Sequence, residues 1–375
     1  MFHIIFSLPA LYVIARLLWP LPLALPIKLA LALFILIGSQ YHLVCRLSSG
    51  SVFSPEMPRS LVIAFNWVFI SILMLFFLQL LIDLVRIGVK LAAGTTFVVP
   101  VAVSCSLGLV ILAIAALGVR NAIAVPAIRN VEIVVKDLPD EFSGYRILQL
   151  TDLHISRLFG QHWTQVVVSD ANAIGADLIV VTGDLIDGSL TDRKRDVSPL
   201  QQLHAPDGIY FITGNHEFFF EHASWLNEVQ ALGMTALENR HVVLRRGQGA
   251  LVLAGVTDLS AQETGFPGPD VGKALEGAPA GVPVVLLDHQ PKLARDAAGL
   301  GVAVQLSGHT HGGLAPGVDR LFALANGGYV SGHYDVGGMQ LYVNNGTALW
   351  PGFAFRLGRP PELTCITLKK APRTI

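Results

Sequence analysis

The stretch Leu178-Ile-Val-Val-Thr-Gly-Asp184 is the part of this sequence that says most about the fold. A short run of aliphatic and β-branched residues closed by a turn residue is typical of a fully buried strand. Gly183 permits a tight backbone turn, and Asp184 then places a carboxylate at the end of the strand. The stretch therefore predicts a buried strand that presents a charged group at its carboxyl end.

The same arrangement recurs along the second half of the chain. Polar residues close further apolar runs at Asp152-Leu-His154, Gly214-Asn-His-Glu217, His289 and Gly308-His-Thr-His311. This pattern delivers carboxylate, imidazole and carboxamide groups to one edge of a β structure. Oxygen and imidazole donors without a thiolate suit Mn, Fe or Zn in a hydrolytic site. We therefore predict a metal-dependent enzyme that hydrolyses a phosphoester.

The prediction depends on the ordered set and not on any single fragment. Taken alone, Gly183-Asp184 is typical of an ordinary turn, and His289 within Asp288-His-Gln-Pro291 carries little information. Gly308-His-Thr-His-Gly312 is the most specific member of the set. Two cations about 3.5–4 Å apart need an anionic ligand that touches both, and Asp184 is the candidate for that bridge.

These residues resemble the calcineurin-like metallophosphoesterases over roughly residues 145–368. Gly308-His-Thr-His-Gly-Gly313, Leu341-Tyr-Val-Asn-Asn-Gly346 and Pro360-Pro-Glu-Leu-Thr364 are similar to the bacterial membrane-associated branch. In that branch a Gln usually follows the glycines, whereas Leu314 stands here, a departure that bears on substrate contacts more than on metal binding.

The resemblance implies an α/β fold, a four-layer αββα sandwich. It implies two divalent metal ions, the first held with Asp184 by Asp152, His154 and His311, and the second held with Asp184 by Asn215, His289 and His309. It also implies that His216 contacts the scissile phosphate and helps to protonate the leaving oxygen, while a metal-bound hydroxide attacks. An imidazole suits that role because its ordinary pKa lies near neutral pH.

Composition shows that much of the chain is not in water. Hydrophobic residues make up 52% and charged residues 14%, with a mean hydropathy of +0.56, against about 25% charged residues in soluble domains. Of the 26 basic and 27 acidic residues, 9 and 6 precede residue 143, which leaves 17 and 21 and a formal net charge of −4 for the remainder. An acidic domain excludes nucleic acid as an expected partner.

The first part of the chain predicts a multi-pass membrane anchor over residues 1–120. Four apolar stretches each approach the roughly 20 residues that a membrane-spanning helix needs: Phe2–Trp19, Ile27–Val44, Leu61–Leu84 and Phe97–Val119. Asp83 near the end of the third stretch can pair with Arg86. We expect an inner-membrane protein. Four helices would place two groups of four basic residues on opposite sides of the bilayer: Arg16, Lys28, Arg86 and Lys90 on one side, and Arg46, Arg59, Arg120 and Arg129 on the other. Because cytoplasmic loops are recognised by an excess of Lys and Arg, these equal counts do not decide on which side the catalytic domain lies.

The remainder predicts a linker with an edge strand over residues 121–142 and an α/β phosphoesterase domain over residues 143–370. Strand-like runs alternate there with helical patterns at 161–174, 222–232 and 291–300, which argues for an α/β domain. No Cys-x-x-Cys spacing supports a thiolate metal site.

Several polar residues stay open to two interpretations. Glu217 can orient His216 or cap the helix that follows it. Asp258 can line the site, and His333 can contact substrate or lie on a loop, which we favour. We expect His204, His222 and His241 to be surface histidines.

Three functions fit the pattern. The leading hypothesis is a membrane-anchored phosphohydrolase acting on phosphodiester, monoester or pyrophosphate bonds. The anchor would hold the site near the headgroups, which favours a lipid-linked substrate. The alternative is a membrane signalling or scaffold protein whose metal site is structural or inactive. A small transporter is a third hypothesis, against which the lack of polar positions at the middle of the apolar stretches argues.

Overall fold

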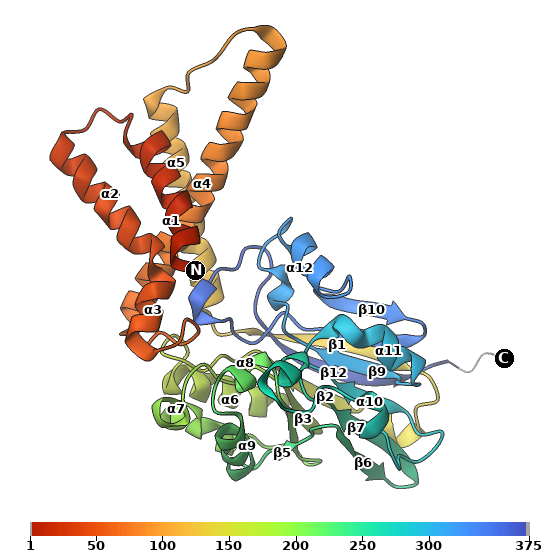
Figure 1. The fold of residues 1–375 in the computed structure, drawn as a ribbon. Coiled ribbons are helices and arrows are strands. Elements are labelled where there is room, and N and C mark those ends of the chain that lie inside the picture. Colours follow the sequence, from red (N-terminus) through yellow and green to blue (C-terminus); the bar gives the residue numbers. More distant parts are fainter. Residues whose placement is uncertain (1, 373–375) are drawn as a thin grey trace. The chain divides into compact units, whose positions relative to one another are not determined.

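The computed structural model describes residues 2–372 (Figure 1). The chain divides into two compact units. The helical unit comprises residues up to Ala122 together with the segment Pro351–Phe355. The sheet unit comprises Ile123–Trp350 and the residues from Arg356 onward.

The helical unit contains five α-helices among the described residues: α1 (Phe2–Val13), α2 (Leu25–Ser39), α3 (Tyr41–Ser49), α4 (Arg59–Ala93) and α5 (Val101–Ala122). Of these, α4 with 35 residues and α5 with 22 are long and apolar enough to cross a membrane, and α2 with α3, bent by 56°, can form a third span. A shorter apolar helix covers Ile5–Leu18. All four predicted apolar stretches are largely helical, although residues 97–100 of the fourth precede α5, and their count as four membrane spans stays a prediction.

The segment Pro351–Phe355 returns from the sheet unit to the helical unit and is held there by buried hydrogen bonds. Nδ2 of Asn66 donates to the carbonyl of Pro351 at 2.8 Å, and its Oδ1 accepts from the backbone N–H of Ala354 at 2.7 Å. The Tyr41 hydroxyl donates to the same Pro351 carbonyl at 2.8 Å. Since Asn66 and Tyr41 are fully buried, these bonds supply the partners that polar groups need away from water.

The sheet unit contains two six-stranded sheets, which confirms the predicted α/β sandwich. The order in the first is β1 (Ala127–Val135), β12 (Glu362–Lys370), β2 (Arg146–Leu150), β3 (Leu178–Thr182), β4 (Ile209–Ile212) and β5 (Thr235–Ala236). The order in the second is β10 (Gly332–Val336), β11 (Met339–Val343), β9 (Val304–Ser307), β8 (Val284–Leu287), β7 (Gly249–Gly255) and β6 (Arg240–Arg246).

Parallel strands form the middle of both sheets. Strands β2 to β5 are parallel neighbours in the first sheet, as are β7, β8, β9 and β11 in the second. Their largely apolar sequences follow from burial on both faces, and every residue of β3, β8 and β9 is buried. Strands β6 and β10 are antiparallel edges of the second sheet, while β12 pairs antiparallel with β2 and parallel with the edge strand β1.

The four layers arise because each sheet is apolar on two faces. Between the sheets lies one core that includes Ile147, Val180 and Ile212 of the first sheet with Leu253, Val285 and Leu306 of the second. The outer face of the second sheet packs on α10 (Val271–Ala274) and α11 (Ala294–Gly299). The remaining helices of the sheet unit are α6 (Gln161–Ile174), α7 (Leu190–Val197), α8 (Asn215–Phe219), α9 (His222–Ala231) and α12 (Asp319–Ala325).

Candidate metal centre

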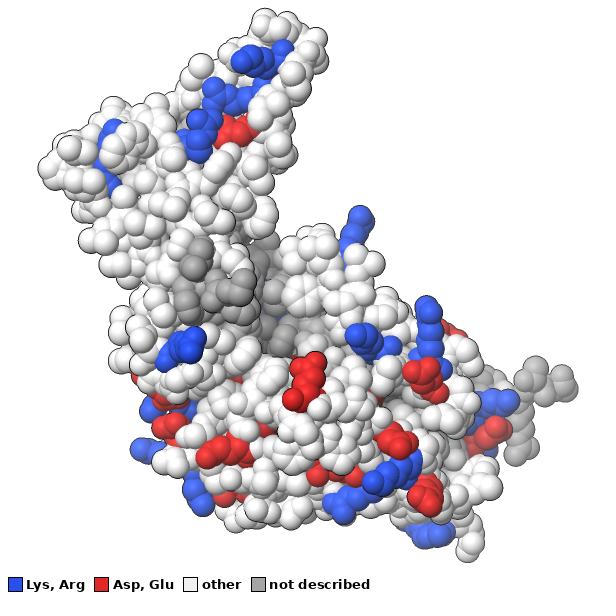
Figure 2. All heavy atoms as spheres, viewed as in Figure 1, with Lys and Arg blue, Asp and Glu red and all other residues white. Residues whose placement is uncertain are grey.

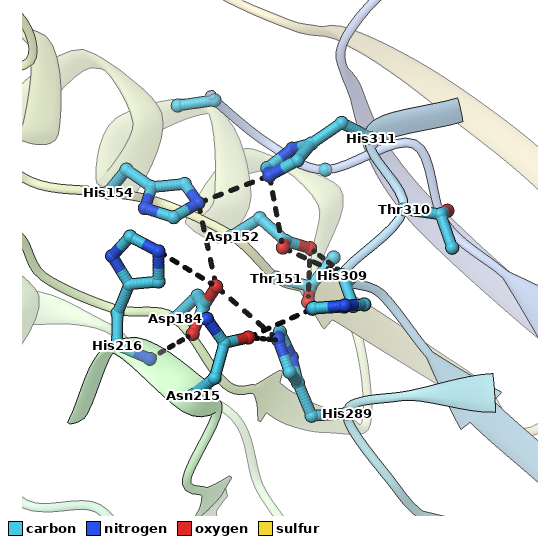
Figure 3. A network of polar contacts seen from close by, with 12 residues as sticks. Thr151, Asp152, His154, Asp184, Asn215, His216, His289, His309, Thr310 and His311 are labelled. Carbon is cyan, nitrogen blue, oxygen red and sulfur yellow. Dashed lines mark hydrogen bonds and ion pairs between the residues drawn. The ribbon is translucent and has the colours of Figure 1, made fainter. Parts of the chain in front are cut away.

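All eight predicted site residues lie just beyond the carboxyl ends of five parallel strands. Strand β2 precedes Asp152 and His154, β3 precedes Asp184, β4 precedes Asn215 and His216, β8 precedes His289, and β9 precedes His309 and His311. Parallel strands end at a common edge, which is where α/β sheets bind ligands. Figure 3 shows the side chains turned toward one another in a single polar network.

The backbone at this edge is unusual. Five of the predicted ligands adopt a left-handed φ: Asp152 (51°), His154 (42°), Asp184 (52°), His309 (67°) and His311 (49°). Such conformations cost about 1–3 kcal/mol each in a non-glycine residue and cluster at functional sites. The strand ends therefore turn sharply enough to direct the ligand side chains inward.

Glycine 183 is required for the close approach of the strands here. Its φ is +92°, and a Cβ on it would lie 2.6 Å from the backbone nitrogen of Gly214 and 2.7 Å from Nδ1 of His289. A side chain at this position would force apart two of the turns that carry the site. This agrees with the role that the sequence predicts for Gly183.

One group of donors consists of Asp152, His154 and His311. Their ligand atoms all lie within 4.8 Å of one another, with Nε2 of His154 only 3.3 Å from Nε2 of His311. Nε2 of His311 is 3.7 Å from Oδ1 of Asp152. Asp152 is itself fixed by the Thr151 hydroxyl, which donates to its Oδ2 at 2.8 Å.

A second group consists of Asp184, His289 and His309, again within 4.8 Å of one another. The Asn215 carboxamide oxygen joins this group, since it lies 3.2 Å from Nε2 of His289 and 2.9 Å from Nδ1 of His309. Nδ1 of His289 lies 2.8 Å from the carbonyl of Thr182. That bond places the proton on Nδ1 and leaves Nε2 free to bind a cation.

The Asp184 carboxylate lies between the two groups. Its Oδ2 is 3.7 Å from Nε2 of His154 in the first group and 3.4 Å from Nε2 of His289 in the second. Its Oδ1 accepts the backbone N–H of His216 at 2.8 Å. The structure thus puts the predicted bridging carboxylate between both sets of donors.

The donor set fits divalent cations. Burial, together with the charge of Asp184, raises the pKa of Asp152, because two carboxylates taken out of water repel each other. Burial followed by the charge of His289 lowers the pKa of His309 to about 3, and burial followed by His154 lowers that of His311 well below its usual value. His309 and His311 are therefore neutral, which is the form in which an imidazole binds a metal ion.

Asp187 is the residue that the sequence interpretation missed. It is fully buried, its Oδ2 lies 3.1 Å from Nδ1 of His154, and its Oδ1 contacts Nδ1 of His216. One carboxylate therefore orients both a predicted ligand and the predicted acid. A second Asp three residues after Asp184, at the same strand end, was a signal in the sequence that could have found it.

Glu217 fixes the backbone at Asp184, the predicted bridging residue. It is buried, and its carboxylate accepts the backbone N–H groups of Gly214, Asp184 and Leu185 at 2.6, 3.0 and 2.7 Å. The bond to Gly214 caps the start of α8, the helix in which Glu217 itself stands, and not the helix that follows it. The bonds to Asp184 and Leu185 add a role that the sequence did not predict, because they fix the turn that carries Asp184.

Arg356 supports the His311 loop. It is fully buried, and its guanidinium donates to the carbonyls of His311, Asn345 and Ala348 at 3.1, 2.6 and 2.6 Å. Leu314 lies buried close by with a φ of 66°. Its carbonyl accepts the N–H of Leu357 at 2.9 Å, so this position serves the backbone of the loop.

Three minor expectations are corrected or refined. His333 lies on strand β10 with its side chain exposed, and not on a loop. His222 is 8% exposed and its Nε2 lies 2.9 Å from Glu238, so it is not a surface histidine. Asp258 is fully buried and accepts from the Gln290 amide at 3.0 Å, which makes it a support for the loop after His289.

Comparison with known proteins identifies the family. The family described as calcineurin-like phosphoesterase matches residues 145–313. A zebrafish (Danio rerio) protein named transmembrane protein with metallophosphoesterase domain is 33% identical over 323 residues, which is 82% of this chain and 74% of the zebrafish chain. A Bos taurus protein of the same name is 34% identical over 68% of this chain and 60% of its own.

A Helicobacter pylori protein named uncharacterized metallophosphoesterase is 32% identical over 253 residues, 67% of this chain and 66% of its own. The chain belongs to the calcineurin-like metallophosphoesterase family, and so to the metal-dependent phosphoester hydrolases. Since vertebrate and bacterial relatives match at similar identity, the resemblance extends beyond the bacterial branch.

Proposed function

We propose that this chain is a membrane-anchored phosphohydrolase with a dinuclear metal centre. The observation that carries the proposal is the place of Asp184, whose carboxylate lies 3.7 Å from the donor nitrogen of His154 and 3.4 Å from that of His289. A single carboxylate between two sets of nitrogen and oxygen donors is the arrangement that a two-metal site needs.

We assign the ligands as the sequence predicts. The first ion is held by Asp152, His154, His311 and Asp184, and the second by Asp184, Asn215, His289 and His309. Divalent ions of the Mn, Fe or Zn type would polarise the phosphoryl oxygens and lower the pKa of a water molecule. The protein residues orient the substrate and control the remaining proton transfer.

We assign that proton transfer to His216. Its Nδ1 is held by Asp187, so its Nε2 is the atom that faces the site, 3.9 Å from Oδ2 of Asp184. Burial alone would lower the pKa of His216, but the charges of Asp184 and Asp187 outweigh it and raise the pKa to about 9. With a proton on Nε2, the ring would be able to donate to a leaving oxygen.

We further propose a phosphodiester or pyrophosphate bond of a lipid-linked molecule as the substrate. Two helices of the chain are apolar and long enough to cross a membrane, and two vertebrate relatives are named as transmembrane proteins. Tethering a catalytic domain to a bilayer raises its effective concentration toward substrates in the same surface. Inner-membrane location belongs to the same proposal.

Hydrolysis of bis-(p-nitrophenyl) phosphate by the purified full-length protein tests the activity. We expect turnover that requires added Mn²⁺ and that Asp184→Ala abolishes, because the bridge between both groups is lost. Asp192→Ala, which removes an exposed carboxylate on α7, should retain activity. Bound metal without turnover in the wild type would instead favour the alternative, a signalling or scaffold protein with an inactive site.

The substrate class has its own test. The same protein in nanodiscs is offered a lipid-linked pyrophosphate and a soluble nucleoside diphosphate at equal concentration, and phosphate-containing products are measured. Faster cleavage of the lipid-linked compound supports the proposal. Cleavage of the soluble compound alone would contradict the lipid part and leave the phosphohydrolase assignment intact.

A further inference from the structure

A small cavity within the helical unit carries two arginines, and none of the metal-centre residues lines it. Its volume is about 150 Å³, and Arg16, Arg86, Gln79 and Ser104 line it together with aliphatic residues such as Leu17, Ile82 and Val98. The lining comes from the end of the first helical stretch, the last third of α4 and the start of α5. Figure 2 shows the helical unit as mostly white, with its few blue and red spheres gathered in small groups.

Asp83 fixes one of the two arginines. Its Oδ2 accepts Nε of Arg16 at 2.9 Å and its Oδ1 accepts Nη2 at 2.6 Å, and the Tyr12 hydroxyl donates to Oδ2 at 2.6 Å. Arg86, the partner predicted from the sequence, approaches Asp83 only to 4.0 Å. The close partner of Asp83 is therefore Arg16, and the guanidinium of Arg86 lies at the cavity without a close ion pair to Asp83.

The charge around the cavity is positive. Arg16 and Arg86 line it, against the single carboxylate of Asp83. The sequence up to Ala122 contains only one other acidic residue, Glu56. A net positive, partly apolar cavity between membrane helices is expected to bind an anion that carries hydrocarbon.

We propose that this cavity binds the phosphate group of an anionic glycerophospholipid. The guanidinium of Arg86 would hold the phosphate in a two-pronged hydrogen bond, with Arg16 held in place beside it by Asp83. The aliphatic wall would contact the first carbons of the acyl chains. At about 150 Å³ the cavity is smaller than the 300–1,000 Å³ typical of whole small-molecule ligands, so it suits a headgroup whose chains remain in the bilayer.

The position along α5 fixes which leaflet supplies the lipid. Val101 and Ser104 of the cavity belong to the first turns of α5. The helix then runs 22 residues, or about 33 Å at 1.5 Å per residue, to Ala122. The lipid therefore belongs to the leaflet at the Val101 end of α5, about one bilayer thickness from Ala122.

Native mass spectrometry tests the proposal. The full-length protein in detergent is mixed with dioleoyl phosphatidylglycerol or with dioleoyl phosphatidylcholine, and the lipid that stays bound after the detergent is removed is measured. We expect one phosphatidylglycerol to be retained in preference to phosphatidylcholine. Arg86→Gln should reduce that retention roughly tenfold, as loss of one charge-assisted pair predicts. Lys90→Gln is the matched control, because it removes a cation one turn away on the same helix that does not line the cavity.

A second variant approaches the cavity from another helix. Ser104→Phe fills it from α5 and keeps both members of the Arg16–Asp83 pair, and it should also abolish selective retention while leaving the thermal midpoint in lipid-free detergent near that of the wild type. Competition with inorganic phosphate distinguishes the two sources of the same chemical group. Phosphate binding without selective lipid retention would overturn the proposal, as would equal losses in Arg86→Gln and Lys90→Gln.

Discussion

The carboxylate of Asp187 contacts Nδ1 of His216 through one oxygen, while its other oxygen lies 3.1 Å from Nδ1 of His154. Both rings consequently present Nε2 to the site. The predicted acid and a predicted metal ligand share one buried support, so a change at Asp187 acts on both.

Replacing Asp187 with Asn should lower kcat for bis-(p-nitrophenyl) phosphate by about 10- to 100-fold, the usual effect of losing a residue that orients a metal ligand. The KM should change little, because Asp187 does not face the substrate. The alkaline limb of the kcat profile should also move to lower pH, since the carboxylate charge helps to raise the pKa of His216 and the protonated form is the active one.

Asp192→Asn serves as its control, because Asp192 lies five residues further along with an exposed side chain. An Asp187→Asn enzyme with wild-type kcat and an unshifted profile would show that His216 is not the acid.

Glu217→Gln should destabilise the sheet unit and weaken metal binding. Three backbone N–H groups point at the Glu217 carboxylate, and an amide would turn its NH₂ toward at least one of them. We expect a loss of about 1–3 kcal/mol in the free energy of unfolding and release of Mn²⁺ at lower chelator concentration. Glu221→Gln, which affects one exposed bond to Leu190, should change both quantities much less; equal effects would argue against the proposed support of Asp184.

Asp288 should make the metal-free protein less stable as pH rises. Burial, followed by the charge of Asp258, raises its pKa to about 8, whereas an unfolded chain ionises near 4. The unfolded state therefore releases this proton first, and stability that is fully present below about pH 4 is lost progressively up to about pH 8. In EDTA, Asp288→Asn should raise the thermal midpoint relative to wild type at pH 8 more than at pH 5, and a pH-independent difference would contradict this assignment.

Asn66→Leu should loosen the segment Pro351–Phe355. The substitution leaves the buried N–H of Ala354 without the oxygen that accepts it at 2.7 Å, a loss of about 1–3 kcal/mol. Thermal unfolding in detergent measures the loss. Ser71→Ala is the control on the same helix, because the Ser71 hydroxyl bonds only within α4, to the carbonyl of Trp67 at 2.6 Å; a shift as large as that of Asn66→Leu would assign the effect to α4 alone.

The sequence predicted the middle of both sheets because β3 and β8 are continuous apolar runs, and β9 is preceded by the apolar residues Val302 and Ala303. It missed β6 and β10, because neither is a continuous apolar run. Strand β6 begins and ends with basic residues, and β10 contains Gly332, His333 and Asp335. The two-residue β5 was too short to produce a pattern.

The predicted site residues come together because each closes such a run. Arg356 could not be found in this way: its partners His311, Asn345 and Ala348 are brought to it by the fold, and nothing in Ala354-Phe-Arg-Leu357 distinguishes it. Asn66 is a similar case, since a lone Asn in an apolar helix does not reveal that its partner is almost 300 residues away.

The return of Pro351–Phe355 to the helical unit also means that this chain is not modular in the way its sequence suggests. A fragment that begins at Ile123 would keep every metal-site residue, yet its Pro351 carbonyl and Ala354 N–H would lose Tyr41 and Asn66. The ring of Phe355 would likewise lose Gly118, where any side chain would overlap it. Transplanting the sheet unit onto another set of helices therefore requires this segment to be redesigned, or to be moved together with the helices that hold it.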